Sequence, residues 1–347
     1  MVAGLPDELW HLIFSYLDWE TLDRSIPDVC KAFRTLVFWT PGAHVEINDT
    51  ERYKLYHIVG SATMLRNTRR EDLAPTVAKW RKTLRHFESR GFATLLNDMS
   101  PLSRSPYLTS LSGRIFSHNV SERNRLTRLE FDNVIVTDTQ FIAVVERCPH
   151  LREMIIGPDT RELSDVGISR LANLTRFELR GVAPRIGDAG LRCMIVKSRL
   201  KRFVLTVRSP GITAATLTHL RKNPGPSLEH LEIGYKTPVS PLLIEAGGRL
   251  KTLRCILFNT VADALACGAC PVLETLDIGP NLLTKRDMAR VTAGCPMLRD
   301  ISGGFFTDQM IEAIVHTYPS CTLRVRSPKQ AAYSRWQGHP GLSLIEA

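Results

Sequence analysis

Two cysteines in the stretch CGAC, at 267–270, have a spacing that occurs in metal and redox sites. A metal site of this kind needs two further ligands at suitable spacing, and the sequence offers none. Cys270 also belongs to a second pattern, a recurring Cys-Pro pair. That pair stands at Cys148-Pro149, Cys270-Pro271 and Cys295-Pro296. We therefore interpret these cysteines as core residues, and we expect no metal and no cofactor.

Catalytic motifs are also missing from the sequence. The ten histidines form no HExxH pair, and there is no GxSxG, no phosphate-binding GxxxxGK(S/T) and no GxGxxG that opens a helix. We expect no catalytic residue and a protein that is not an enzyme.

A set of arginines stands between the apolar positions of short strand-like segments. Side chains alternate in direction along a strand, so these arginines should share one open face. Arginine binds carboxylate and phosphate groups through paired hydrogen bonds. Two interpretations stay open: the face binds an acidic or phosphorylated segment of a protein, or its side chains are merely solvated. The candidate residues are Arg176, Arg180, Arg202, Arg254, Arg324 and Arg326.

The segments that carry these arginines form a repeat. Blocks such as LTRLEF, LTRFEL and LEHLEI return eight times, and their first leucines are 22 to 28 residues apart. The first leucines are Leu126, Leu151, Leu174, Leu200, Leu228, Leu250, Leu273 and Leu298. Most blocks have apolar residues two positions apart, which is the period of a strand.

A second pattern follows all but one of the strand blocks and predicts the start of a helix. It usually offers Ser or Thr as an N-cap residue. The predicted helix starts lie at 136–141, 163–168, 186–191, 212–217, 239–244, 283–288 and 306–311.

A strand, a turn, a helix and a turn in 22 to 28 residues are typical of leucine-rich repeats. Such units bury their apolar faces by stacking, which gives a curved solenoid with the strands on its concave side. We predict these repeats for residues 126–326. We expect a linker and degenerate first repeats at 41–125, with strands near 45–47, 84–89 and 107–112 and a solvent-facing insertion at 61–72. Residues 327–347 should form a C-terminal cap or a flexible tail.

Composition narrows the class of protein further. The formal charge of +10 would suit nucleic acid, anionic lipid or an acidic protein, but basic residues are scattered among acids in runs of at most two. We thus do not expect nucleic-acid binding. We expect no secretory signal, because Asp7 and Glu8 stand where a basic stretch would precede the apolar segment, and no apolar run reaches membrane-spanning length. A cytoplasmic or nuclear protein with reduced cysteines and no membrane contact is expected.

The stretch LPDELWHLIFSYLDWETL, at 5–22, predicts a helix with a broad apolar face. Leu9, Ile13 and Leu17 recur every four residues, and Pro6 suits a first helical turn. The segment up to residue 40 is too short to form a core of its own. Its apolar face should either cap the first repeat or dock on a partner.

These residues resemble the F-box motif, and proteins of that family join it to leucine-rich repeats. The LPxEL opening corresponds to residues 5–9, and the closing element to Val29-Cys30-Lys31 and Phe33. The fold implied for the whole chain is α/β, a leucine-rich repeat solenoid with a small all-α F-box at 1–40. The resemblance implies an adaptor interface at Leu5, Pro6, Leu9, Ile13, Leu17, Leu22, Val29 and Phe33.

The resemblance implies the substrate receptor of a Skp/cullin/F-box ubiquitin ligase. The F-box would bind the Skp-type adaptor and, through it, a cullin, while the repeats would bind a protein substrate for ubiquitination. Two alternatives remain: a leucine-rich scaffold that acts outside a cullin complex, and a basic repeat protein that binds nucleic acid. The sequence leaves open whether a small molecule occupies the concave face.

Overall fold

The structure is a computed structural model of the 347-residue chain. The residues that it describes are 44–47, 64–67, 82–89, 105–113, 125–131, 135–158, 160–222, 227–234, 242–244, 247–255, 259–279, 284–303, 306–318, 321–325, 336 and 342–346. The chain divides into two compact units, Met1–Asp159 and Thr160–Ala347.

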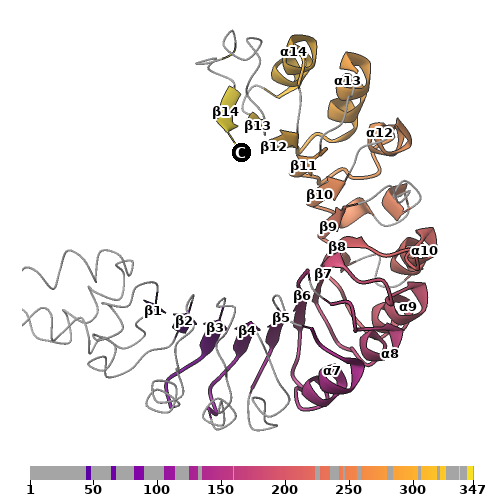
Figure 1. Cartoon of the computed structure of the whole chain (residues 1–347). Coiled ribbons are helices and arrows are strands. Elements are labelled where there is room, and N and C mark those ends of the chain that lie inside the picture. The colour runs from indigo at the N-terminus through magenta and orange to yellow at the C-terminus, as the bar shows by residue number, and fades with distance from the viewer. Residues whose placement is uncertain are drawn as a thin grey trace, which may run out of the picture. The chain divides into compact units, whose positions relative to one another are not determined.

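The first unit contains a parallel sheet in which consecutive strands are neighbours (Figure 1). Each strand is four residues long. The strands are β1 (His44–Ile47), β2 (Met64–Asn67), β3 (His86–Ser89), β4 (Ser110–Gly113), β5 (Arg128–Phe131) and β6 (Glu153–Ile156), and helix α7 (Asp138–Val145) connects the last two.

Strand β3 falls within its predicted segment, and β1 and β4 overlap theirs and extend one residue beyond them, to His44 and Gly113. The solvent-facing insertion expected at 61–72 is wrong for its middle part, because residues 64–67 form β2. This strand pairs with β1 on one side and β3 on the other. The series of parallel strands therefore begins before residue 126, at His44.

The second unit contains another run of parallel strands, each paired with the next. These are β7 (Arg176–Val182), β8 (Arg202–Arg208), β9 (His230–Ile233), β10 (Thr252–Cys255), β11 (Thr275–Asp277), β12 (Asp300–Gly303), β13 (Cys321–Val325) and β14 (Leu342–Glu346). Strand β14 lies in the segment for which the sequence leaves a cap or a tail open. It adds a strand to β13 and so continues the sheet.

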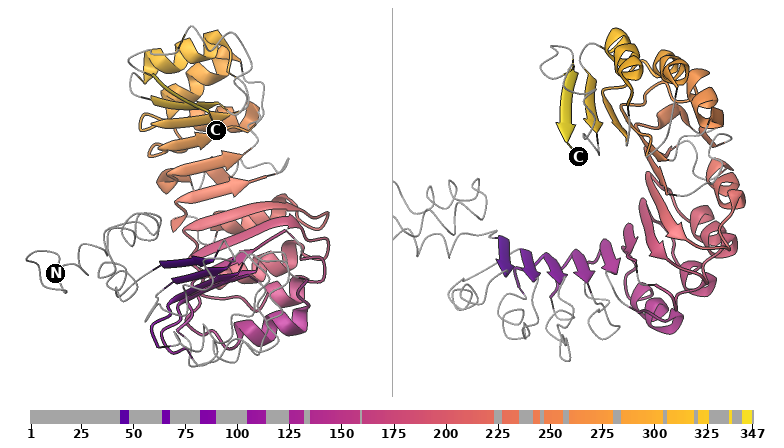
Figure 2. Two further views of the ribbon diagram at one scale, coloured as in Figure 1. Left: turned by 60° about the vertical axis from the view of Figure 1, so that its left-hand side comes forward. Right: turned by 45° about the horizontal axis from the view of Figure 1, so that its top comes forward.

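Helices follow most strands of the second unit and lie on one side of its sheet (Figures 1 and 2). They are α8 (Asp165–Ile168), α9 (Asp188–Val196), α10 (Ala214–Lys222), the 3-10 helix η3 (Gly247–Arg249), α12 (Asn259–Ala266), α13 (Lys285–Gly294) and α14 (Asp308–Thr317). The sequence pattern does not predict helix α12.

The predicted N-caps are confirmed at several helices. Thr137, Ser164, Thr284 and Thr307 each accept a hydrogen bond from a backbone N–H of the first turn. Such a cap satisfies donors that have no partner within the helix. Because helix α9 has Gly187 at this position, it lacks a side-chain cap.

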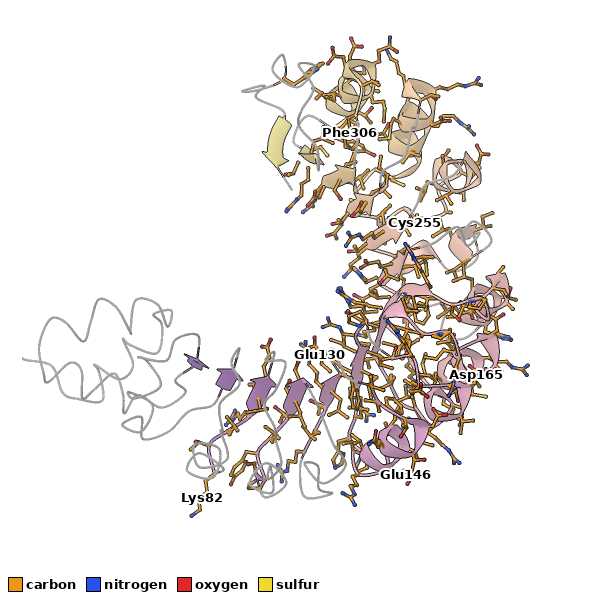
Figure 3. The ribbon with its side chains drawn as sticks, viewed as in Figure 1. Lys82, Glu130, Glu146, Asp165, Cys255 and Phe306 are labelled. Carbon is orange, nitrogen blue, oxygen red and sulfur yellow. The ribbon has the colours of Figure 1, made fainter. Side chains whose placement is uncertain are left out.

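The core of the second unit lies between its strands and its helices (Figure 3). Phe177 of β7 stacks on Phe203 of β8, with 6.0 Å between ring centroids. Their counterparts on later strands are Leu231, Leu253, Leu276, Ile301 and Leu323, all buried. One continuous row of apolar side chains thus runs across the strands, as the repeat pattern predicts.

Aspartates at helix starts connect successive repeats of the second unit. Asp165, at the start of α8, accepts a hydrogen bond of 2.7 Å from the backbone N–H of Gly187 in the next repeat. Asp188 accepts hydrogen bonds from the backbone and hydroxyl groups of Thr213 and Thr216. These contacts fix the spacing of the helices and, through them, of the strands.

Within the described residues, no helix has the length and apolar composition that crossing a membrane requires.

Candidate binding surface on the strands of the second unit

Strands β7 to β11 place charged side chains on the face of the sheet opposite to the helices. The strand register puts Arg176, Arg202 and His230 in one row across β7, β8 and β9. Glu178, Val204 and Glu232 form the next row. Because parallel strands lie about 4.8 Å apart, residues within a row are close neighbours. We call the charged residues and the histidine on this face of β7 to β11 the strand face. They are Arg176, Glu178, Arg180, Arg202, His230, Glu232, Arg254 and Asp277.

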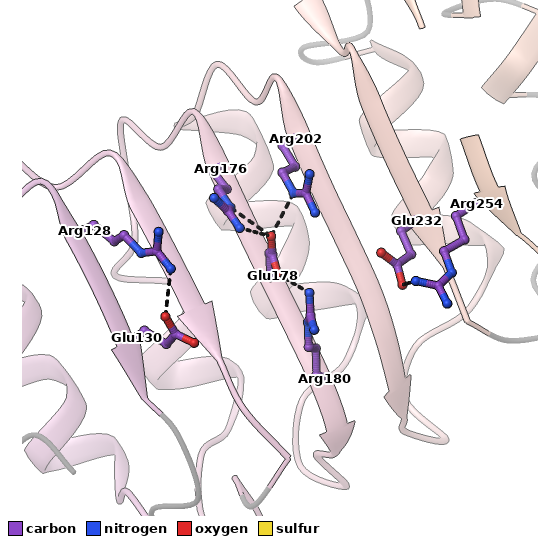
Figure 4. Close-up of polar contacts among 8 residues, drawn as sticks. All are labelled: Arg128, Glu130, Arg176, Glu178, Arg180, Arg202, Glu232 and Arg254. Atoms are coloured by element: carbon purple, nitrogen blue, oxygen red, sulfur yellow. Dashed lines mark hydrogen bonds and ion pairs between the residues drawn. The ribbon is translucent and has the colours of Figure 1, made fainter. Parts of the chain in front are cut away.

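Glu178 is the centre of an arginine cluster on the strand face (Figure 4). Its carboxylate accepts hydrogen bonds from Nε of Arg176 at 2.8 Å and from Nε of Arg202 at 2.8 Å. A terminal nitrogen of Arg180 lies 2.6 Å from the other carboxylate oxygen. Only 1% of the Glu178 side chain is exposed, whereas the exposed fractions of the three arginines are 28%, 49% and 35% for Arg176, Arg180 and Arg202.

Burial alone would raise the pKa of the Glu178 carboxyl group, because a charge is costly in a poorly solvated place. The ion pair with Arg176 and the hydrogen bonds from Arg176 and Arg202 outweigh that effect and hold the pKa below its usual value. Glu178 is thus ionised at neutral pH. Three guanidinium groups and one carboxylate leave this cluster with two positive charges.

Some hydrogen-bond donors of the cluster are not used by the described residues. Arg202 contacts Glu178 only through Nε, and Arg180 contacts it only through one terminal nitrogen. Their other terminal N–H groups have no partner within the described ranges. Since both side chains are partly exposed, these donors are open to a bound molecule.

His230 continues the row of Arg176 and Arg202 on β9. Its Nε2 atom is buried and has no hydrogen-bond partner in the described part of the chain. Burial and the positive charges of Arg202, Arg176 and Arg254 together lower the pKa of this imidazole to about 4, against the opposing effect of Glu178. His230 is therefore neutral at pH 7, beside a cluster that is strongly positive.

Arg254 forms a second cluster on β9 to β11. Its guanidinium contacts Glu232 at 3.3 Å and Asp277 at 2.9 Å, on the strands to either side. The exposed fractions are 12% for the Glu232 side chain and 10% for Asp277. One arginine and two carboxylates leave a single negative charge, so the strand face is positive at β7 and β8 and slightly negative at β9 to β11.

The last two arginine candidates lie outside the strand face. Arg324 of β13 donates to both carboxylate oxygens of Asp300 at 3.2 and 3.1 Å. The sequence pattern does not single out Asp300, although it occupies the position of Arg176 and His230 within its repeat. Arg326 is outside the described residues. Within the first unit, β5 carries a similar pair, with a terminal nitrogen of Arg128 2.8 Å from Glu130.

The residues predicted for the adaptor interface all lie outside the described ranges, and their role remains a prediction. They are Leu5, Pro6, Leu9, Ile13, Leu17, Leu22, Val29 and Phe33.

The two cysteines of CGAC differ in their surroundings. Cys267 is exposed, while Cys270 is buried. Burial raises the pKa of Cys270 to about 12, so that it is a protonated thiol at neutral pH. Cys148 and Cys295, the other members of the Cys-Pro pattern, are buried too. Among the residues that the structure describes, no group of three metal-ligating side chains occurs.

The strand face joins arginines, carboxylates and a neutral histidine, a set of groups that can bind charged side chains of another molecule. The strand positions of the arginines are visible in the sequence. The sequence does not show that these arginines converge on one carboxylate. Their pairing with Glu178 depends on neighbouring strands and on side-chain conformations.

Comparison with known proteins gives a likeness of fold. The sequence matches no protein-family description and no curated protein. Among solved structures, the chain resembles a chain of the "Crystal structure of Rad7 and Elc1 complex in yeast", with a TM-score of 0.53 and 13% sequence identity. The match covers 98% of this chain and 93% of that chain. The likeness is one of fold, an α/β repeat arrangement in the residues that the structure describes.

Proposed function

We propose that this protein is the substrate-recognition subunit of a Skp/cullin/F-box ubiquitin ligase, and that it performs no chemistry itself. Its F-box binds the Skp-type adaptor, and the strand face binds a protein to be ubiquitinated. The receptor acts by holding substrate lysines at high effective concentration near a ubiquitin-loaded enzyme of the complex.

The strand face is the observation that carries this proposal. Arginine side chains on β7, β8 and β10 remain partly exposed instead of being covered by the chain. The stacked repeats hold them at fixed spacing, so they are ready to bind a partner without further ordering of the backbone. Pre-ordering of this kind lowers the entropic cost of binding.

The likeness of fold supports a binding role in general terms. The similar chain was crystallised in a complex of two proteins, Rad7 and Elc1, so a chain with this fold is found together with a protein partner. The more specific assignment to a Skp adaptor and a cullin rests on the sequence resemblance at residues 5–33.

The proposed adaptor interface consists of large apolar residues such as Leu9, Ile13 and Leu17. Burial of each side chain would contribute about 1.5 to 3 kcal/mol before the cost of association is subtracted. A charged residue in such an interface loses its hydration without gaining a partner. Two aspartates should therefore abolish adaptor binding.

Affinity capture of the tagged protein from cells tests the proposal. Wild type should retain both a Skp-type adaptor and a cullin, whereas the double variant Ile13→Asp, Leu17→Asp should lose both. Val166→Asp is a matched control, because it adds a charge at a residue of α8 that is already 57% exposed. This control should retain the adaptor.

Other outcomes would support the two alternatives. Capture of the adaptor without a cullin would indicate a scaffold that acts outside a ligase. Capture of RNA or DNA that is lost steeply as salt is raised would indicate a nucleic-acid-binding protein.

A further inference from the structure

We infer that the part of the strand face around Arg202 and His230 binds a phosphate group carried by a protein segment. This inference names the substrate class of the proposed receptor and so rests on the proposed function. The phosphorylated side chain would lie over β7 to β9, next to the Glu178 cluster.

Charge favours phosphate over a carboxylate at this place. Glu178 already supplies the carboxylate that three arginines share, and the cluster still carries two positive charges. A phosphorylated side chain has a charge of about −1.5 to −2 at pH 7. One phosphate would therefore neutralise the cluster, whereas one further carboxylate would leave it positive.

The available donors fit a group with several acceptor oxygens. Arg202 keeps its two terminal nitrogens free of partners among the described residues, and Arg180 keeps one. The buried Nε2 of His230, on the strand next to Arg202, also has no partner there. A phosphate offers three acceptor oxygens to such donors. A bound phosphate would thus satisfy a buried polar atom that is otherwise unsatisfied.

The second cluster of the strand face argues for a protein segment as the carrier. Glu232 and Asp277 outnumber Arg254, so this area is slightly negative. A nucleic acid carries negative charge along its whole backbone and would meet that area unfavourably. A peptide can place a phosphate over β7 and β8 and a lysine or arginine over β9 to β11.

The strand spacing predicts the distance between these two groups. From β8 to β10 or β11 there are two or three strand intervals, or about 10 to 14 Å. An extended peptide advances about 3.3 Å for each residue. The basic residue should therefore lie about three or four positions from the phosphorylated one.

Fluorescence anisotropy with labelled peptides and the purified full-length protein tests this inference. The probes are alanine-rich peptides with one phosphoserine and one lysine at varied spacing. We expect the phosphorylated peptide to bind at least about tenfold more tightly than the same peptide with serine, because hydrogen bonds between charged groups are strong. Binding should be tightest when the lysine is about three or four residues away.

Two variants locate the site. Arg202→Gln and His230→Gln should each weaken binding of the phosphopeptide by about tenfold, while binding of the serine peptide stays as weak as before. Arg290→Gln is the matched control, because Arg290 lies on α13, is 45% exposed and pairs with Asp263. It should leave the affinity within about twofold. Thermal unfolding of each variant checks that it is folded. If one of the two variants does not fold, the other still tests the site.

Several results would overturn the inference. Equal affinity for the phosphorylated and serine peptides would exclude a phosphate site, and so would unchanged affinity in both Arg202→Gln and His230→Gln. Inorganic phosphate that displaces nothing at millimolar concentration would also count against it. Tighter binding of a single-stranded RNA than of any phosphopeptide would assign the surface to nucleic acid.

The outcome is separable from that of the proposed function. If the protein captures a Skp adaptor but no phosphopeptide, the ligase proposal stands and the phosphate site is wrong. If it binds the phosphopeptide at Arg202 but captures no adaptor, the site stands without the ligase.

Discussion

Glu178 determines how much positive charge the strand face presents. Its carboxylate is almost fully buried, and it accepts hydrogen bonds from three arginines of β7 and β8 at 2.6 to 2.8 Å. The arginines are partly exposed, so solvent screens their charges from one side. The cluster therefore combines a structural role, holding two strands together, with a surface of excess positive charge.

Replacement of Glu178 by glutamine should destabilise the protein. The three guanidinium groups would lose their shared counter-charge and repel one another. We expect the free energy of unfolding to fall by about 2 kcal/mol, less than for a fully buried ion pair because the arginines reach solvent. Urea unfolding of wild type and variant measures this difference in free energy. Glu162→Gln, which breaks the exposed pair with Arg185, should cost at most about 0.5 kcal/mol; equal costs for the two variants would contradict this account.

The same cluster predicts a pH dependence. The pKa of Glu178 is lower in the folded protein than its ordinary value of 4.5. Its stabilising contribution is therefore complete above pH 4.5 and is lost as the pH falls through the folded-state pKa. The difference in unfolding free energy between wild type and Glu178→Gln should be constant near neutrality and should shrink in acid. A difference that grows on acidification would contradict the assignment.

The pKa of His230 reports the electrostatic effect of the neighbouring charges on the strand face. Its pKa is lowered to about 4 by burial and by Arg202, Arg176 and Arg254, with Glu178 acting in the opposite direction. Replacement of Arg202 by glutamine should raise this pKa, because one nearby positive charge is removed. NMR titration of the imidazole measures the shift. An unchanged pKa in Arg202→Gln would mean that His230 does not sense the arginine cluster.

Close contacts between neighbouring helices set the spacing of the repeats. A side chain at Gly294, the last residue of α13, would collide with the backbone oxygen of Leu265 in α12 and would lie 2.8 Å from Cα of Ala266. Backbone atoms cannot move aside as a flexible side chain can. Gly294 therefore lets two helices approach closely enough for their strands to pair.

Substitution at Gly294 tests this contact. Gly294→Ala should lower the free energy of unfolding by about 1 to 3 kcal/mol, as overpacking in a core does. Gly248→Ala is the matched control, since nothing lies within 4 Å of an added Cβ there. The control should change stability by no more than about 0.5 kcal/mol. If urea unfolding gave the same result for both, the close packing of α12 and α13 would be refuted.

The repeat could be predicted from the sequence because the same apolar positions are buried in successive repeats. Leucines such as Leu174, Leu200 and Leu228 are buried at equivalent places, and their spacing is visible in the sequence. Strand β2 could not be predicted in this way, because MLRN lacks the leucine pattern and is followed by charged residues. It forms a strand because β1 and β3 pair with it on both sides, and such neighbours override local preference.

The candidate site could be predicted only in part for a similar reason. The positions of Arg176, Arg202 and Arg254 follow from the strand period, which places them on the open face. Their partners depend on strand register, which brings Glu178 of β7 beside β8 and Arg254 of β10 between Glu232 and Asp277. Sequence alone shows the charges but not which of them remain in excess.

The proposed function requires one chain to bridge a Skp-type adaptor and a protein substrate. Isothermal titration calorimetry of the purified protein with a purified Skp-type adaptor measures the adaptor side of this bridge. Wild type and Val166→Asp should bind the adaptor tightly in a one-to-one complex, and the double variant Ile13→Asp, Leu17→Asp should show no detectable binding. No heat of binding with wild type, or equal affinity in wild type and the double variant, would contradict it.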